Sequence, residues 1–118
     1  MNEEKLTYSI RGAMFEVYNT LGGGFLESVY QEALGIEFER KGIRFEKEKH
    51  IYIQYKNKVL NKYFIADYLC EDEVLIEIKA VSELLKEHEA QILNYLKATD
   101  LRLGILVNFG PRKIDIRR

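Results

Sequence analysis

The sequence is poor in the residues that cross-link or stiffen a chain. Its 118 residues include one cysteine, Cys70, one proline, Pro111, and no tryptophan. A lone cysteine excludes an internal disulfide and is typical of a reducing compartment, so we expect a cytoplasmic protein. Long apolar runs are also absent, and the N-terminus leads into an amphipathic segment. We therefore expect neither a signal peptide nor a membrane span.

Neither sign of charge is in excess. Lys and Arg number 18 and Asp and Glu number 19, for a formal net charge of −1. This balance gives no global electrostatic case for binding nucleic acid. A local basic cluster near the C-terminus, at Arg112, Lys113, Arg117 and Arg118, could contact phosphates, although terminal charge runs are more often simply solvated. The length and the hydrophobic content of 47% predict one globular domain over residues 1–118.

Hydrophobic periodicity divides the chain into helical and extended segments. Apolar residues at three- and four-residue spacing predict helices over 7–21, 26–41 and 83–98. Alternation or apolar runs predict strands over 43–49, 50–55, 63–69, 74–80, 103–109 and 113–118. The resulting order, α-α-β-β-β-β-α-β-β, indicates an α/β fold with a mixed sheet flanked by helices.

The segment from Tyr63 to Ala80 is the most informative stretch, because it predicts a β-hairpin whose apolar strands are interrupted by three charges. These are Asp67, Glu77 and Lys79. If the hairpin loop is 71–73, an antiparallel register pairs Asp67 with Glu77 and brings all three charges to one face. A two-residue loop at 71–72 would instead place Asp67 opposite Ile76.

Two carboxylates facing each other on a partly buried surface need a partner, because buried charge without one is costly. A divalent metal ion would let both stay ionised. The alternative is a structural salt bridge between Lys79 and Glu77 or Asp67 on a solvated sheet face. The spacing alone leaves both interpretations open.

Two helical faces carry further polar candidates. Glu27 and Tyr30 are three residues apart and share a face of the predicted helix 26–41. The alternative interpretation is structural: Glu27 in the first turn of the helix complements the helix dipole, and Tyr30 packs in the core. On the helix 83–98, His88, Gln91 and Tyr95 form a polar stripe that begins soon after Lys79 and so can pass near the carboxylates.

The chain resembles a known family over most of its length. Gly24-Phe-Leu-Glu27-Ser-Val-Tyr30 is similar to the Gly-x-x-Glu-x-x-Tyr signature of the small bacterial and archaeal GxxExxY family. The stretches 88–95 and 103–109 also resemble that family. Asp67 followed by Glu77-Ile-Lys79 resembles the core motif of the PD-(D/E)XK nuclease superfamily, to which the family has been assigned. The proline that often precedes the first aspartate is replaced by Ala66, at a position that varies across the superfamily.

The resemblance implies a restriction-endonuclease-like core with a metal site at a bent hairpin. Carried over by position, Asp67 and Glu77 would bind Mg²⁺ or Mn²⁺, and the carbonyl of Ile78 would be a further ligand. Glu27 would join as a third carboxylate, directly or through water. Lys79 would orient the attacking water or help to deprotonate it.

Gln91 and Tyr95 resemble a Gln-x-x-x-Tyr pair of helicase-associated nucleases, where the pair supports the site or the substrate. The implied activity is metal-dependent hydrolysis of phosphodiester bonds in DNA, or alternatively in RNA. A nuclease this small is also expected to work as a homodimer or within a larger nucleoprotein complex.

Two other functions compete with this one. A non-catalytic module that binds nucleic acid or protein could use the same fold, since fold does not imply function. In that case Asp67, Glu77 and Lys79 would pair with one another and leave no room for a metal. A small-molecule or redox enzyme is disfavoured, because the sequence has no second cysteine, no dinucleotide fingerprint and no nucleophile-elbow motif.

Overall fold

A computed structural model describes residues 2–118. In this range the chain forms three helices and five strands. They are α1 (Glu3–Leu21), α2 (Glu27–Arg40), β1 (Phe45–Tyr55), β2 (Lys58–Cys70), β3 (Val74–Lys79), α3 (Lys86–Lys97), β4 (Leu103–Phe109) and β5 (Ile114–Arg117). No helix among the described residues is long and apolar enough to cross a membrane.

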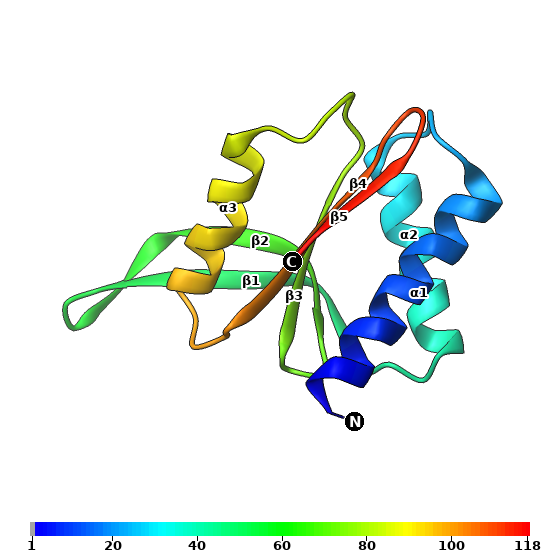
Figure 1. The fold of residues 1–118 in the computed structure, drawn as a ribbon. Coiled ribbons are helices and arrows are strands. Elements are labelled where there is room, and N and C mark those ends of the chain that lie inside the picture. The colour runs from blue at the N-terminus through cyan, green and yellow to red at the C-terminus, as the bar shows by residue number, and fades with distance from the viewer. Residues whose placement is uncertain (1) are drawn as a thin grey trace.

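The five strands form one mixed sheet in the order β1-β2-β3-β4-β5. Neighbours are antiparallel except for β3 and β4, which run parallel and are joined through α3. Helices α1 and α2 cover one side of the sheet, and α3 lies on the other (Figure 1). The predicted class, an α/β fold with a restriction-endonuclease-like mixed sheet, is confirmed.

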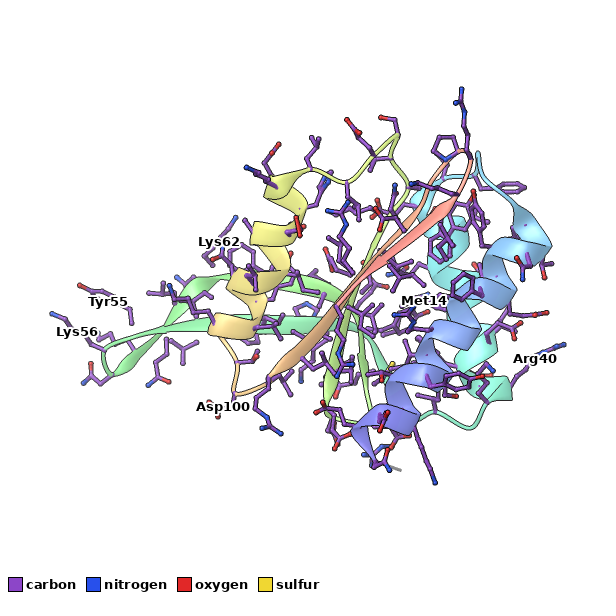
Figure 2. All side chains as sticks on the ribbon, viewed as in Figure 1. Met14, Arg40, Tyr55, Lys56, Lys62 and Asp100 are labelled. Atoms are coloured by element: carbon purple, nitrogen blue, oxygen red, sulfur yellow. The ribbon has the colours of Figure 1, made fainter. Side chains whose placement is uncertain are left out.

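The sheet separates two cores of unequal size. The larger core packs α1 and α2 against alternate residues of the central strands, with Met14, Leu34, Ile76 and Val107 among its fully buried members (Figure 2 labels Met14). The smaller core lies under α3, where Tyr95 and Ile92 meet apolar residues from the opposite face of the strands. Strands β3 and β4 are apolar on both faces because both are covered, as expected for central parallel strands.

Strands β1 and β2 bend sharply, and this bend corrects one sequence prediction. The two strands expected over 43–49 and 50–55 form a single strand, β1, with Glu48 at a positive φ of 55°. Opposite this bend, Ala66 packs in the α3-side core while Tyr68 packs against α1 and α2. Residues two apart normally share a face of a strand, so β2 must rotate at Asp67.

Beyond the bend, β1 and β2 continue as a long hairpin that we call the arm, residues 49–66 (Figure 1). The arm extends past α3 and gives the molecule a longest dimension of 46 Å against a shortest of 21 Å. The radius of gyration of 14.2 Å therefore exceeds the value of about 13.5 Å expected for a compact chain of this length.

Helix α3 begins at Lys86, three residues later than the sequence predicts. Ser82 does not cap it. Instead the ring Nδ1 of His88 accepts a hydrogen bond of 2.9 Å from the backbone N–H of Leu85 and caps the first turn. Leu84 is buried just before the helix, so the segment 82–85 follows the sheet surface rather than the helix axis.

Candidate active site

The candidate site lies where β2 separates from β3. The backbone register of this hairpin pairs Cys70 with Val74, Leu69 with Leu75 and Tyr68 with Ile76. This is the version with a three-residue loop, one of the two registers that the sequence left open. Beyond the Tyr68–Ile76 pair, β2 and β3 are joined by hydrogen bonds between side chains and backbone. The Asp67 Oδ2 accepts a hydrogen bond of 2.7 Å from the Ile78 N–H, and the Asp67 N–H donates to the Glu77 Oε1 over 3.3 Å.

Glu77 and Lys79 project from the same face of β3 as Leu75, toward α3. The Lys79 Nζ lies 3.8 Å from the Glu77 Oε2. Only 7% of the Glu77 side chain and 17% of the Lys79 side chain are exposed. The structure thus brings Asp67, Glu77 and Lys79 together, in a setting that is more buried than a surface salt bridge.

Burial makes this pair of carboxyl groups reluctant to ionise. Loss of solvent raises the pKa of Glu77, and the neighbouring charge of Asp67 raises it further, against the lowering effect of Lys79. Burial also raises the pKa of Asp67, although the hydrogen bonds from Ile78 and Gln31 and the charge of Lys79 work in the opposite direction. A positive charge delivered to the gap would favour the ionised form of both groups.

Helix α2 approaches the site with two polar residues one turn apart. The Gln31 Nε2 donates a hydrogen bond of 2.9 Å to the Asp67 Oδ1. Glu27, four residues earlier, is largely exposed, but its pKa is raised by partial burial and by the charge of Asp67, and lowered by Lys79 and His88. Glu27 therefore lies within electrostatic reach of the hairpin charges without a hydrogen bond to them.

Gln31 escaped the sequence analysis. The available signal was its position four residues after Glu27, which places both on one face of α2. The hydrogen bond between Gln31 and Asp67 is supported by β2, because the Tyr68 hydroxyl donates a 2.6 Å hydrogen bond to the backbone carbonyl of Gln31. Gly35 gives the Tyr68 ring room, since a Cβ there would lie 2.5 Å from the Tyr68 hydroxyl oxygen.

Tyr30 packs in the core and does not contact the candidate site. It is fully buried and stacks on Phe109 with ring centroids 4.6 Å apart. Its hydroxyl donates to the Gly22 carbonyl over 2.6 Å and accepts from the Phe25 N–H over 3.2 Å, which fixes the glycine turn before α2. The turn also needs Gly23, where a Cβ would lie 2.6 Å from the Gly110 carbonyl oxygen.

Helix α3 contributes one residue directly to the surroundings of the carboxyl groups. Tyr95 is buried, and burial together with the charges of Glu77 and Asp67 raises its pKa to about 12. Its phenol therefore stays protonated near neutral pH. Gln91, one turn earlier, is partly buried, and no hydrogen bond joins it to Asp67 or Glu77 among the described residues.

Asn108 is a second positioning residue, within a strand that is otherwise apolar. It is almost completely buried beside Lys79 in the β3–β4 register. Its Oδ1 accepts from the Val81 N–H over 2.9 Å and its Nδ2 donates to the Val81 carbonyl over 3.0 Å. This double contact holds the chain as it leaves β3, directly after Lys79. The sequence analysis missed this role; the signal that could have indicated it is a lone amide within a strand that is otherwise apolar.

The donor set suits a hard divalent cation. Asp67 and Glu77 offer carboxylate oxygens, the ligand type that Mg²⁺ prefers, and a bound cation would relieve the unfavourable burial of their charges. Among residues 2–118, however, no group of three or more His, Cys, Asp or Glu side chains is arranged to hold a metal ion. A complete set of ligands would therefore also need oxygen atoms from the backbone, water or substrate.

These features define a class of protein: a small mixed-sheet fold with an Asp, a Glu and a Lys gathered where a hairpin splits. A family model for the PD-(D/E)XK nuclease superfamily matches residues 4–118. The chain belongs to the PD-(D/E)XK nuclease superfamily. Searches of curated proteins and of solved structures found no match.

Proposed function

We propose that this chain is a metal-dependent nuclease that hydrolyses phosphodiester bonds in DNA, or alternatively in RNA, and that it acts as one domain of the GxxExxY type. The observation that carries the proposal is the gathering of one buried and one partly buried carboxyl group with one ammonium group in the gap between β2 and β3. Nucleases of this superfamily generally use divalent metals, which fits the donor set.

In this proposal Asp67 and Glu77 hold Mg²⁺ or Mn²⁺, with the Ile78 carbonyl as a further ligand and Glu27 as a carboxylate that acts directly or through water. The bound ion would supply Lewis-acid stabilisation of the phosphate and lower the pKa of a water molecule. Lys79, oriented by Glu77, would position that water or help to remove its proton, and its charge would stabilise the negative charge that grows on the phosphate oxygens.

Three further side chains would support the reaction. Gln31 keeps the Asp67 carboxyl group oriented through its hydrogen bond. Tyr95 remains protonated and so can donate a hydrogen bond to a carboxylate or a phosphate. Gln91 lies one turn from Tyr95 and would contact the substrate rather than the carboxyl groups.

A groove beside the site carries positive charge that could hold a substrate backbone. It has a volume of about 730 Å³ and is lined by the segment after β3 and by the β4–β5 turn, with Asn108 in its wall. Its charged lining residues are three basic ones and two acidic ones: Arg112, Lys113, Arg117, Glu83 and Asp115. The other two residues of the C-terminal basic cluster are already paired, Arg117 with Asp115 and Glu89, and Arg118 with Glu3. Only half of that cluster is therefore free to contact phosphates.

One observation favours a different function, a non-catalytic binding module. Both oxygens of Asp67 already accept hydrogen bonds, Glu77 is paired with Lys79, and no three-ligand group is formed within residues 2–118. In this alternative the same surface would recognise nucleic acid or protein without cutting it, as a monomer or in a homodimer.

Calorimetric titration with Mn²⁺ and Mg²⁺ separates the two functions. We expect saturable binding to the wild type that is lost in the Asp67→Ala/Glu77→Ala variant. The matched control is Asp72→Ala/Glu73→Ala, which removes two exposed acidic residues from the loop of the same hairpin and should bind normally. If the wild type binds no ion, even when a short oligonucleotide is present, the nuclease proposal is wrong and the binding module is favoured.

A further inference from the structure

The arm carries a concentration of positive charge that the overall composition conceals. Residues 49–66 contain four lysines, at positions 49, 56, 58 and 62, and no aspartate or glutamate. Because the whole chain has a net charge of −1, the rest of the molecule is net negative. Lys49 is paired with Glu46, but Lys56, Lys58 and Lys62 are exposed and form no ion pair among the described residues (Figure 2 labels Lys56 and Lys62).

The outer face of the arm, which points away from α3, is aromatic. His50 lies opposite Ile65 and Tyr52 lies opposite Tyr63, so these four residues share one face. The His50 and Tyr63 rings are stacked with centroids 4.9 Å apart, and the Tyr52 and Tyr63 rings are 5.6 Å apart. Tyr52 is nevertheless 53% exposed and Tyr63 43% exposed. Rings that are held together and stay about half exposed form a platform on which flat ligands can stack.

The arm also concentrates exposed apolar side chains. Six of the fourteen large hydrophobic residues exposed in the described chain lie in this short segment. At the base of the arm the inner face is covered by α3, through Ile51 and Phe64 against Tyr95, so the outer face is the one open to a ligand there. At the tip, the Lys56 Nζ lies 5.5 Å from the centre of the Tyr55 ring, and both residues project away from the body of the protein (Figure 2).

We propose that the arm is a binding surface for single-stranded nucleic acid, with unpaired bases stacking on Tyr52 and Tyr63 and phosphates contacting Lys56 and Lys58 at the tip. Aromatic platforms combined with basic side chains are how proteins hold single strands, since every base has a face that can stack. A duplex hides those faces, so it should bind more weakly. A second copy of this chain is a poorer occupant, because two arms packed face to face would bring their lysines together.

This inference rests on the proposed function for its ligand, nucleic acid, but the two proposals are tested by different measurements. Binding to the arm needs no metal, so it is measured by fluorescence anisotropy in EDTA, with a labelled 20-nucleotide oligothymidine and a duplex of equal length as probes. A protein that binds the strand but never cleaves it keeps this inference and overturns the nuclease proposal.

The expected result is tighter binding of the oligothymidine than of the duplex, weakened about tenfold or more in Tyr52→Ala/Tyr63→Ala. Tyr52→Phe/Tyr63→Phe keeps the rings and should bind like the wild type. The matched control is Tyr8→Ala, which removes a tyrosine that is 81% exposed on α1. Circular dichroism establishes that each variant is folded.

Salt dependence tests the lysines independently. Removing two phosphate contacts should flatten the slope of log affinity against log salt concentration by about 1.4, because each contact to a single strand contributes about 0.7. We expect this for Lys56→Gln/Lys58→Gln and no change for Lys5→Gln/Lys41→Gln, which removes two exposed lysines elsewhere.

Four outcomes would overturn the inference. They are no binding of the oligothymidine, equal or tighter binding of the duplex, wild-type binding by folded Tyr52→Ala/Tyr63→Ala, and a wild-type dimer that this variant converts to a monomer. The last outcome would assign the face to contacts between copies of the chain.

Discussion

At the scale of single residues, the site combines groups that oppose each other's ionisation. Glu77 is almost completely buried, faces Asp67, and has one nearby cation, Lys79. Such an arrangement costs stability in the free protein and is commonly found where a ligand or ion will later bind. The cost should be visible as a dependence of stability on pH.

Glu77→Gln should stabilise the metal-free protein at alkaline pH. The folded-state pKa of Glu77 is raised above its unfolded value, so the folded state binds a proton that the unfolded state has lost, and wild-type stability falls as pH rises through that interval. The neutral variant does not lose this stability, so at alkaline pH its free energy of unfolding should exceed that of the wild type by on the order of 1–3 kcal/mol. The corresponding rise in melting temperature is several degrees and should vanish near pH 4.

Thermal unfolding in EDTA, followed from pH 4 to pH 9, measures this difference. Glu87→Gln, at an exposed glutamate of α3, is the control and should leave the curve unchanged. Parallel curves for the wild type and Glu77→Gln at every pH would show that Glu77 is not held in a pKa-raising environment.

If the chain is the nuclease proposed above, Lys79→Met should abolish most cleavage while the fold and the binding of metal are kept. The methionine preserves the length of the side chain but removes the charge 3.8 Å from the Glu77 carboxyl group. Loss of one such electrostatic contact to a transition state lowers a rate by about 100-fold or more. A cleavage assay at saturating Mn²⁺ measures the rate, with Lys86→Met as the exposed control. Cleavage at the wild-type rate would remove Lys79 from the mechanism.

At the scale of elements, the site depends on how α2 is seated against β2. The Tyr68 hydroxyl binds the Gln31 carbonyl, and Gln31 in turn binds Asp67, so the position of the helix is transmitted to the carboxyl group. Asn108 on β4 positions Lys79 in a similar way, because its two hydrogen bonds to Val81 hold the chain where it leaves β3. Both contacts join elements that are distant in the sequence.

Gly35→Ala should therefore destabilise the protein, although alanine normally favours helix. The added Cβ would lie 2.5 Å from the Tyr68 hydroxyl oxygen, so the helix or the ring must move, at a cost of about 1–3 kcal/mol. At Gly12 of α1 the nearest atom is the flexible Lys41 Nζ at 3.3 Å, so Gly12→Ala should instead stabilise by roughly 0.5–1 kcal/mol. Urea unfolding compares the two. Equal effects would mean that α2 is not tightly seated.

At the scale of the whole molecule, the sheet divides regions of different stability. Strands β3 and β4 lie between the two cores and are buried along nearly their full length. The arm is covered by α3 only near its base and on one face, and most of its residues between 52 and 63 are exposed. Local opening is easiest where few apolar contacts are lost, so the arm should open far more often than the central strands.

Hydrogen exchange followed by mass spectrometry tests this ordering. Amides of β3 and β4 should exchange slowest, and those of residues 52–63 faster by at least about a hundredfold. Added oligothymidine should slow exchange in the arm if single strands bind there, and Mn²⁺ should slow it around residues 67–79. An arm as protected as β4 without any ligand would contradict this picture of the molecule.

The sequence by itself determined much of this protein. Local periodicity located all three helices and the strands, because alternation along a strand and helical spacing are local properties. The spacing of Asp67, Glu77 and Lys79 predicted the hairpin and reduced its register to two alternatives, of which the structure has the three-residue loop. It did not reveal the late start of α3 or the union of two predicted strands into β1, because a histidine cap and a positive φ at Glu48 depend on neighbouring elements. Only the tertiary structure decided that Gln31 and Asn108 support the site and that the arm's rings and lysines share one projecting hairpin. These are contacts between segments far apart in the chain, and such contacts are set by packing rather than by local pattern.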